Sequence, residues 1–411
     1  MSLFPTLMTG PGPEAIRPCP ILFRAARGLT LVPGQGIVHD FGLLILGQRI
    51  LAAGPHAEVL ARIPMCAPVG LGQVEPRDLG EVTLAPGLIN AHAHLEMSHL
   101  KGRTASGQGF LAWIKSLVAQ PLYQAEPAAM DAAIAQMQAS GTVLVADIAT
   151  RNAGLAAERL AASGLWFLSF HEAIGQGKPP AALPPQPGGR GRAAWAGHAL
   201  YSTSGQVLAR AKAVSNAAGL PFSLHLAEHD DEVSILDHGG GPFAEMLAAR
   251  GIMKHFDAPG KSPVAHADSL GLLDGKTLCV HCVKVGDEDI NILARCKAPV
   301  CLCPRSNEHI GVGRAPWEKL MEAGITLCLG TDSLASNQDL DLWAEVRFVK
   351  ERFQGPLGLT RAVALVTREA ARALGVGTDF GTLEPGKIAA FSVMPEDLFN
   401  LFERADHAVA S

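Results

Sequence analysis

Short apolar runs alternate with helix-like stretches across most of this chain, and this alternation constrains the fold more than any other feature. The apolar runs lie at residues 88–90, 141–148, 165–170, around 198, and at 221–228, 277–283, 298–304 and 325–333. Amphipathic stretches between them, such as 128–140, 207–219 and 317–324, end in glycine or serine, which suits a helix C-terminus. Strands that alternate with helices predict a parallel sheet, and eight repeats predict its closure into a (β/α)8 TIM barrel of the α/β class.

Two segments lie outside this repeat. Residues 20–85 contain short strand-like runs separated by turns, which is typical of a small all-β unit. The stretch from Gly381 predicts a hairpin that turns at Pro385 and Gly386. The expected domains are a barrel of residues 86–375 and a small β-sandwich of residues 1–85 and 376–411.

The composition excludes several classes of protein. Hydrophobic residues make up 48% and charged residues 18% of the chain, which describes a globular protein. The net charge of -5 gives no indication of nucleic-acid binding, and no apolar run is long enough to span a bilayer. Without a secretory signal at the N-terminus, we expect a cytoplasmic protein with reduced cysteines. Cys301 and Cys303 form a weak zinc motif, but their place in an apolar strand favours core packing.

The first sign of chemistry is the pair His92 and His94, directly after the first apolar run. Residues two apart on a strand face the same side, so both imidazoles point into one space. Neutral imidazoles that converge in this way suit zinc or ferrous iron. The alternative is a chance pair, because the chain has 15 histidines.

Three further polar residues end later apolar runs: His225, His281 and Asp332. The C-terminal ends of barrel strands form the face where TIM-barrel enzymes hold their active sites. The sequence therefore predicts a single metal centre with room for a water molecule. The predicted ligands are His92, His94, His225 and Asp332.

Catalytic roles follow from this arrangement. A bound cation lowers the pKa of water, and Asp332 is placed to accept the proton of that water. His281 is expected to orient the water or stabilise charge beside it. Glu228 lies three residues after His225, where a general acid would reach a ring nitrogen of the substrate. The alternative for Glu228 is a solvated charge in a loop. The long excursion at 229–270 that follows is a candidate lid.

These residues together resemble the amidohydrolase superfamily, in particular its hydrolytic deaminase and chlorohydrolase branch. The resemblance implies the metal set above, with Glu228 as proton shuttle and His281 and Asp332 handling the water. It also implies an accompanying β domain and, since no strand end carries a lysine, one divalent ion, Zn²⁺ or alternatively Fe²⁺. The matching stretches are PGLINAHAHLEMSHLKG, HALYSTS, SLHLAEH, CVHCV, CPRSN, LGTDSLASN and LEPGKIAAF, from about residue 84 to 391.

Within this branch, CPRSN and LASNQDLDL are most similar to the aminodeoxyfutalosine deaminases of the alternative menaquinone pathway. This resemblance makes His198, Trp113 and Arg305 candidates for substrate binding. The alternatives are a packing role for Trp113 and a structural role for Arg305. Methylthioadenosine and S-adenosylhomocysteine deaminases carry a carboxylate shortly after the tryptophan helix, but here no acid occurs before Glu126.

We therefore expect a deaminase that acts on the exocyclic amine of a purine nucleoside-like small molecule, with 6-amino-6-deoxyfutalosine as the first candidate. Alternatives are an S-adenosylhomocysteine, methylthioadenosine or other aminopurine deaminase, and a chlorohydrolase or cyclic amide hydrolase with the same centre. A scaffold without activity is the remaining alternative. Relatives in the branch make a homodimer a possible assembly.

Overall fold

The computed structural model describes residues 19–66, 74–122, 124–252 and 257–410. Residues 1–18 of the predicted β domain, which also carry the prediction of no secretory signal, lie outside these ranges. So do residues 253–256 of the candidate lid.

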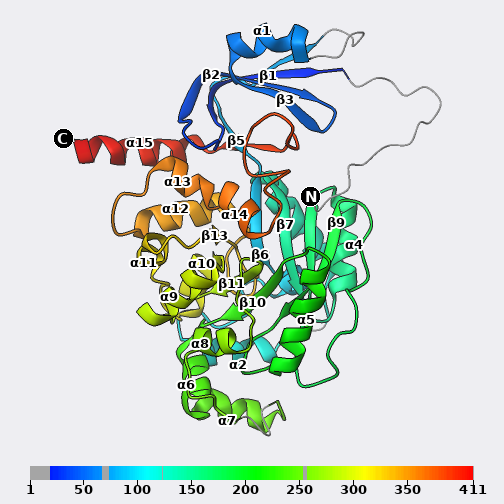
Figure 1. The fold of residues 1–411 in the computed structure, drawn as a ribbon, viewed down its shortest axis with the longest axis vertical. Helices are drawn as coiled ribbons and strands as arrows, with labels where there is room; N and C mark the ends of the chain where they lie inside the picture. Colours follow the sequence, from blue (N-terminus) through cyan, green and yellow to red (C-terminus); the bar gives the residue numbers. More distant parts are fainter. Residues whose placement is uncertain (1–18, 67–73, 123, 253–256, 411) are drawn as a thin grey trace.

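Eight parallel strands form one sheet in chain order, which confirms the predicted barrel (Figure 1). Every predicted apolar run forms or borders one of these strands. The segment between the third and fourth strands, rich in proline and glycine, forms no helix. The strands are β6 (Leu88–Ala93), β7 (Thr142–Ala149), β8 (Trp166–Ala173), β9 (Gly191–Gly197), β10 (Phe222–Leu226), β11 (Thr277–His281), β12 (Val300–Leu302) and β13 (Leu327–Leu329).

Helices cover the outside of the barrel, and those expected at 128–140, 207–219 and 317–324 are present. Leu224 and Leu226 of β10 pack in one buried cluster with Leu208 and Ala211 of the preceding helix. Because side chains alternate along a strand, His225 points to the opposite face, into the barrel. The helices are η1 (Leu95–Leu100), α2 (Phe110–Val118), α3 (Pro127–Ala139), α4 (Ala153–Ser163), α5 (Gly205–Ala217), α9 (Asp287–Cys296), α10 (Pro304–Ile310), α11 (Trp317–Glu322), α12 (Leu342–Arg352), α13 (Leu359–Ala364) and α14 (Arg368–Ala373).

The first and last strands meet where β13 ends beside β6. Ala93 and Asp332 form a parallel bridge, and the Asp332 backbone N–H donates to the His92 carbonyl over 3.0 Å. A Cβ atom at Gly330 would lie 2.7 Å from the Cβ of His92 and 2.8 Å from its backbone N and O. Glycine at this position therefore lets the two strand ends approach closely.

Replacement of Gly330 by alanine is expected to lower the free energy of unfolding by roughly 1–3 kcal/mol, the usual cost of overpacking a tight site. The new methyl group would force the backbone of His92 to move. Gly154 is the control, because it lies in α4 with nothing within 4 Å of an added Cβ. Gly154→Ala should be neutral or slightly stabilising, since alanine favours helix. Urea denaturation of both variants tests this, and equal stabilities would contradict the close-approach argument.

Both ends of the chain also build a separate β unit, as predicted, and its described strands form one six-stranded sheet. Helix α1 (His56–Cys66) covers one of its faces, where Val59 packs with Leu22, Leu44 and Ala52. The described part of this unit is thus one sheet with a helix against it. Its strands, in the order β14-β5-β1-β2-β3 with β4 beside β1, are β1 (Ile21–Leu29), β2 (Ile37–Leu46), β3 (Arg49–Pro55), β4 (Glu75–Asp78), β5 (Thr83–Pro86) and β14 (Phe391–Met394).

The predicted C-terminal hairpin was wrong in its pairing. The chain does turn at Pro385 and Gly386, but β14 pairs with β5, and Ile388 forms a bridge with Arg49. The segment therefore pairs with strands from the N-terminal part of the chain, and these pairings replace the local hairpin.

The last helix, α15 (Glu396–Ala410), lies against the barrel (Figure 1). Its residues Phe399 and Phe402 are buried in the same cluster as Val346 and Val349 of α12. The domain limits at residues 86 and 376 stay a prediction. In the described part of the chain, no helix combines the length and apolar character needed to cross a membrane.

The excursion after β10 forms three helices, α6 (Asp230–His238), α7 (Pro242–Ala249) and α8 (Pro263–Ser269). Helices α6 and α7 lie at the end of the molecule opposite the six-stranded sheet (Figure 1). Cys301 and Cys303 are buried in the barrel with other apolar side chains, as the packing interpretation expected.

Candidate metal centre

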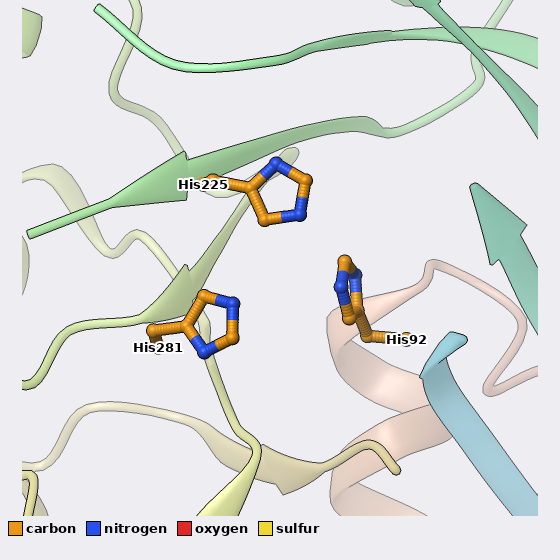
Figure 2. Close-up of side chains that lie close together, drawn as sticks. All are labelled: His92, His225 and His281. Carbon is orange, nitrogen blue, oxygen red and sulfur yellow. The ribbon is translucent and has the colours of Figure 1, made fainter. Parts of the chain in front are cut away.

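Histidines from three different barrel strands face one another (Figure 2). The ring centroids of His92 and His225 lie 5.0 Å apart, and those of His92 and His281 lie 5.9 Å apart. His225 and His281 are stacked with centroids 5.7 Å apart. Nitrogen atoms of these three side chains lie within 4.8 Å of one another, as the ligand atoms of one cation do.

His94 and Asp332 join the same centre. The Nε2 atoms of His92 and His94 lie 3.0 Å apart, and Oδ1 of Asp332 lies 3.7 Å from the first and 3.5 Å from the second. His92 thus belongs to two groups with ligand spacing, one with His225 and His281 and one with His94 and Asp332. The structure brings all four predicted ligands and His281 together.

Strained backbone directs some of these side chains. His281 and Asp332 have φ angles of 74° and 58°, in the left-handed region that residues with a Cβ rarely adopt. Ala227, just before Glu228, has a φ of 52°. Such a conformation costs of order 1–3 kcal/mol and persists where the surrounding structure enforces it, often at functional sites. Here the strained residues all lie at or just after strand ends at the candidate centre.

Hydrogen bonds to His225 and His281 fix the ring tautomer that leaves one nitrogen free to bind a cation. Nδ1 of His225 lies 3.1 Å from the His198 carbonyl, and Nδ1 of His281 lies 2.9 Å from Oδ1 of Asn307. Both partners accept, so each Nδ1 carries the proton and each Nε2 keeps a free lone pair. Burial, together with the neighbouring imidazoles, lowers the pKa of His92 and His225 well below the ordinary value and keeps these rings neutral.

The Asp332 carboxylate is held on one side only. Its Oδ2 accepts from the hydroxyls of Ser306 over 2.6 Å and Ser336 over 3.0 Å. Its Oδ1 faces the imidazoles of His92 and His94. Neutral imidazoles and an oriented carboxylate form the donor set of single-zinc and ferrous sites, so these residues fit the predicted cation.

Glu228 lies beside this group. Its Oε1 is 3.8 Å from Nε2 of His281, and its backbone N–H donates to Oε2 of Glu232 over 2.8 Å. Burial, and secondly the charge of Asp332, raise the pKa of the Glu228 carboxyl well above its ordinary value. Glu228 therefore keeps its proton at higher pH than an ordinary carboxyl, as a general acid requires.

A cavity of about 250 Å³ opens over the centre. His94, His225, His281, Asp332 and Glu228 form its polar end. The opposite walls come mainly from apolar side chains of α2 and α7, so the candidate lid contributes to the pocket. These walls include Met97, Phe110, Ile114, Leu117, Phe243, Met246 and Leu247.

The three substrate-binding candidates have different positions. Trp113 and His198 line the cavity; the Trp113 Nε1 donates to the Ala335 carbonyl over 3.2 Å, and Nδ1 of His198 lies 2.6 Å from the Ser202 hydroxyl. Arg305 is absent from the described lining. Its guanidinium donates to both carboxylate oxygens of Asp339 over 2.5 and 2.9 Å, which is the structural alternative considered for it.

The sequence reasoning missed several residues that contact the centre. Glu172 near the end of β8 lines the cavity, and the strand-end pattern used for His225 would have found it. Asn307 and Ser306 lie on α10, inside the noted CPRSN stretch, but no local pattern shows that they bind His281 and Asp332.

Comparison with known proteins adds independent evidence. The chain is 29% identical over 394 residues to the 5-methylthioadenosine/S-adenosylhomocysteine deaminase of Moorella thermoacetica, covering 88% of this chain and 82% of that protein. It is 28% identical over 346 residues to the aminodeoxyfutalosine deaminase of Deinococcus radiodurans, covering 78% and 79%. Helicobacter pylori aminofutalosine deaminase, solved with methylthio-coformycin, shares the fold with a TM-score of 0.78 at 22% identity, covering 90% and 91%.

The model of the amidohydrolase family matches residues 83–407, from the strand before the barrel to the helix after it. Because this match includes every barrel strand and every residue of the centre described above, the chain belongs to the amidohydrolase family.

Proposed function

We propose that this protein is a metal-dependent hydrolytic deaminase that acts on the exocyclic amine of a purine nucleoside-like substrate. The observation that carries the proposal is the buried Glu228 carboxyl, which lies beside His281 at the same polar end of the cavity as three predicted ligands, His94, His225 and Asp332. Attack on an aminated aromatic ring carbon breaks the aromaticity of the ring. It therefore needs an activated water and a proton for the ring nitrogen at the same time.

The residues divide this work. His92, His94, His225 and Asp332 would hold one divalent cation, Zn²⁺ or Fe²⁺. When bound, the cation lowers the pKa of water and so supplies the nucleophile near neutral pH. Oδ1 of Asp332 is free to accept a proton, because the two serine hydroxyls bind only Oδ2. His281, held by Asn307, orients the water, and Glu228 protonates the ring nitrogen beside the leaving amine.

For the substrate, 6-amino-6-deoxyfutalosine is our first candidate. The cavity is polar at the centre and mainly apolar along the walls of α2 and α7, which suits a purine nucleoside whose tail contains an apolar part. Glu126, the first acid after the tryptophan helix, is the N-cap residue of α3 and is not among the described lining residues. The carboxylate expected of methylthioadenosine and S-adenosylhomocysteine deaminases is therefore not supplied by this residue.

Ammonia release from a substrate panel tests the proposal. We expect kcat/KM for 6-amino-6-deoxyfutalosine to exceed that for methylthioadenosine, S-adenosylhomocysteine, adenosine and guanine by about tenfold or more, a difference of about 1.4 kcal/mol in transition-state binding. A higher kcat/KM for one of the other purines would support the deaminase assignment but would make that purine the better substrate candidate. Chloride from a triazine or a new carboxylate from a cyclic amide, without ammonia from any purine, would overturn the deaminase assignment.

A further inference from the structure

One buried carboxylate at the centre has no role in the proposed reaction. The side chain of Glu172, on β8, is 2% exposed. Its Oε2 accepts from the Thr150 hydroxyl over 2.6 Å, whereas its Oε1 has no hydrogen-bond partner in the described chain. This Oε1 lies 3.4 Å from Nδ1 of His225. A buried carboxylate oxygen without a hydrogen-bond donor destabilises the folded state, so another interaction is expected to compensate for it.

We propose that Glu172 is a positioning residue for His225. Nδ1 of His225 lies 3.1 Å from the His198 carbonyl, its hydrogen-bond partner, and 3.4 Å from Oε1 of the Glu172 carboxylate. The carbonyl fixes the tautomer that leaves Nε2 free for a cation, and the negative charge of the nearby carboxylate makes Nε2 a stronger donor. The Thr150 hydroxyl holds the carboxylate in this direction. The inference rests on the proposed metal site.

A purely structural role explains Glu172 less well. The loop that carries Thr150 is already held by another carboxylate, because Glu96 accepts from the backbone N–H groups of Thr150, Arg151 and Asn152. A side chain that only bound the Thr150 hydroxyl would need no charge and no second oxygen beside His225. A bound cation would account for the charge of Glu172, because the ring of His225 would become more positive on binding it and the carboxylate would stabilise that ring.

Zinc affinity of the metal-free protein tests the proposal directly. We expect Glu172→Ala to raise the Kd for Zn²⁺ by about 10–100-fold, the usual effect of losing an outer carboxylate, and Glu172→Gln to raise it less. The Gln variant keeps an acceptor oxygen but lacks the charge. Thr150→Val, which removes only the hydrogen bond that directs Glu172, should raise the Kd by a smaller factor than Glu172→Ala. Competition against a fluorescent chelator measures all four proteins.

Asp289→Asn is the matched control, because it removes the charge of another buried carboxyl, which lies at the start of α9 and is not among the described lining residues of the cavity. We expect it to lower the Tm of the metal-free protein without changing the Kd for Zn²⁺. Glu172→Ala should show the opposite pattern. An unchanged Kd in Glu172→Ala, with or without a lower Tm of the metal-free protein, would overturn the positioning role. If the wild-type protein bound no Zn²⁺ at all, the proposed metal-dependent function would fail first.

Discussion

Replacement of Glu228 by glutamine is expected to lower kcat by about 10²–10⁴-fold, the usual contribution of a general acid. The amide has nearly the same size as the carboxyl but has no acidic proton for the ring nitrogen. Because Glu228 is not a predicted metal ligand, the variant should keep its metal. Steady-state ammonia release and elemental analysis measure the two effects separately.

The pH profile gives the same prediction a second test. Burial and the nearby Asp332 charge raise the pKa of Glu228, and the protonated form is the active acid. Activity should therefore be present below the pKa of Glu228 in the folded protein and decline as the pH rises through it. The residual activity of Glu228→Gln should lack this decline. Glu245→Gln, at an exposed position of α7, is the control and should behave like the wild type. A Glu228→Gln enzyme with wild-type kcat would remove the acid role.

Replacement of His92 by alanine is expected to abolish both turnover and stabilisation by metal. His92 is the only residue common to both described groups with ligand spacing, so its loss disrupts each of them. A ligand at a thousand times its Kd stabilises the folded state by about 4 kcal/mol, and the variant should lose this gain. Thermal unfolding with added Zn²⁺ and with chelator, together with metal content, measures the effect.

His238 provides the control for this experiment, because its side chain is 61% exposed at the end of α6. His238→Ala should keep the wild-type metal content and the wild-type response to chelator. If His92→Ala retained both as well, the cation would have to bind elsewhere, and the centre proposed here would be wrong.

Much of the fold was predictable from local sequence. Each barrel strand is a short apolar run, and most of these runs are followed by an amphipathic stretch that forms a helix, because burial on one face imposes a period that can be read along the chain. No pattern along the sequence reveals the close approach at Gly330 or the strained φ of His281. They depend on how the barrel closes, which is a property of all eight strands together.

The candidate site also has features that the sequence predicts and features that depend on the tertiary structure. The sequence by itself determined the convergence of His92, His225 and Asp332, because the carboxyl ends of parallel strands must meet at one face of the barrel. Only the tertiary structure decided which residues surround them. Asn307 binds His281, and Glu172 faces His225, whereas Arg305 binds Asp339 away from the cavity. These contacts join side chains from separate segments of the chain. Several residues of the same chemical type could make each contact, and a local sequence pattern does not show which of them does.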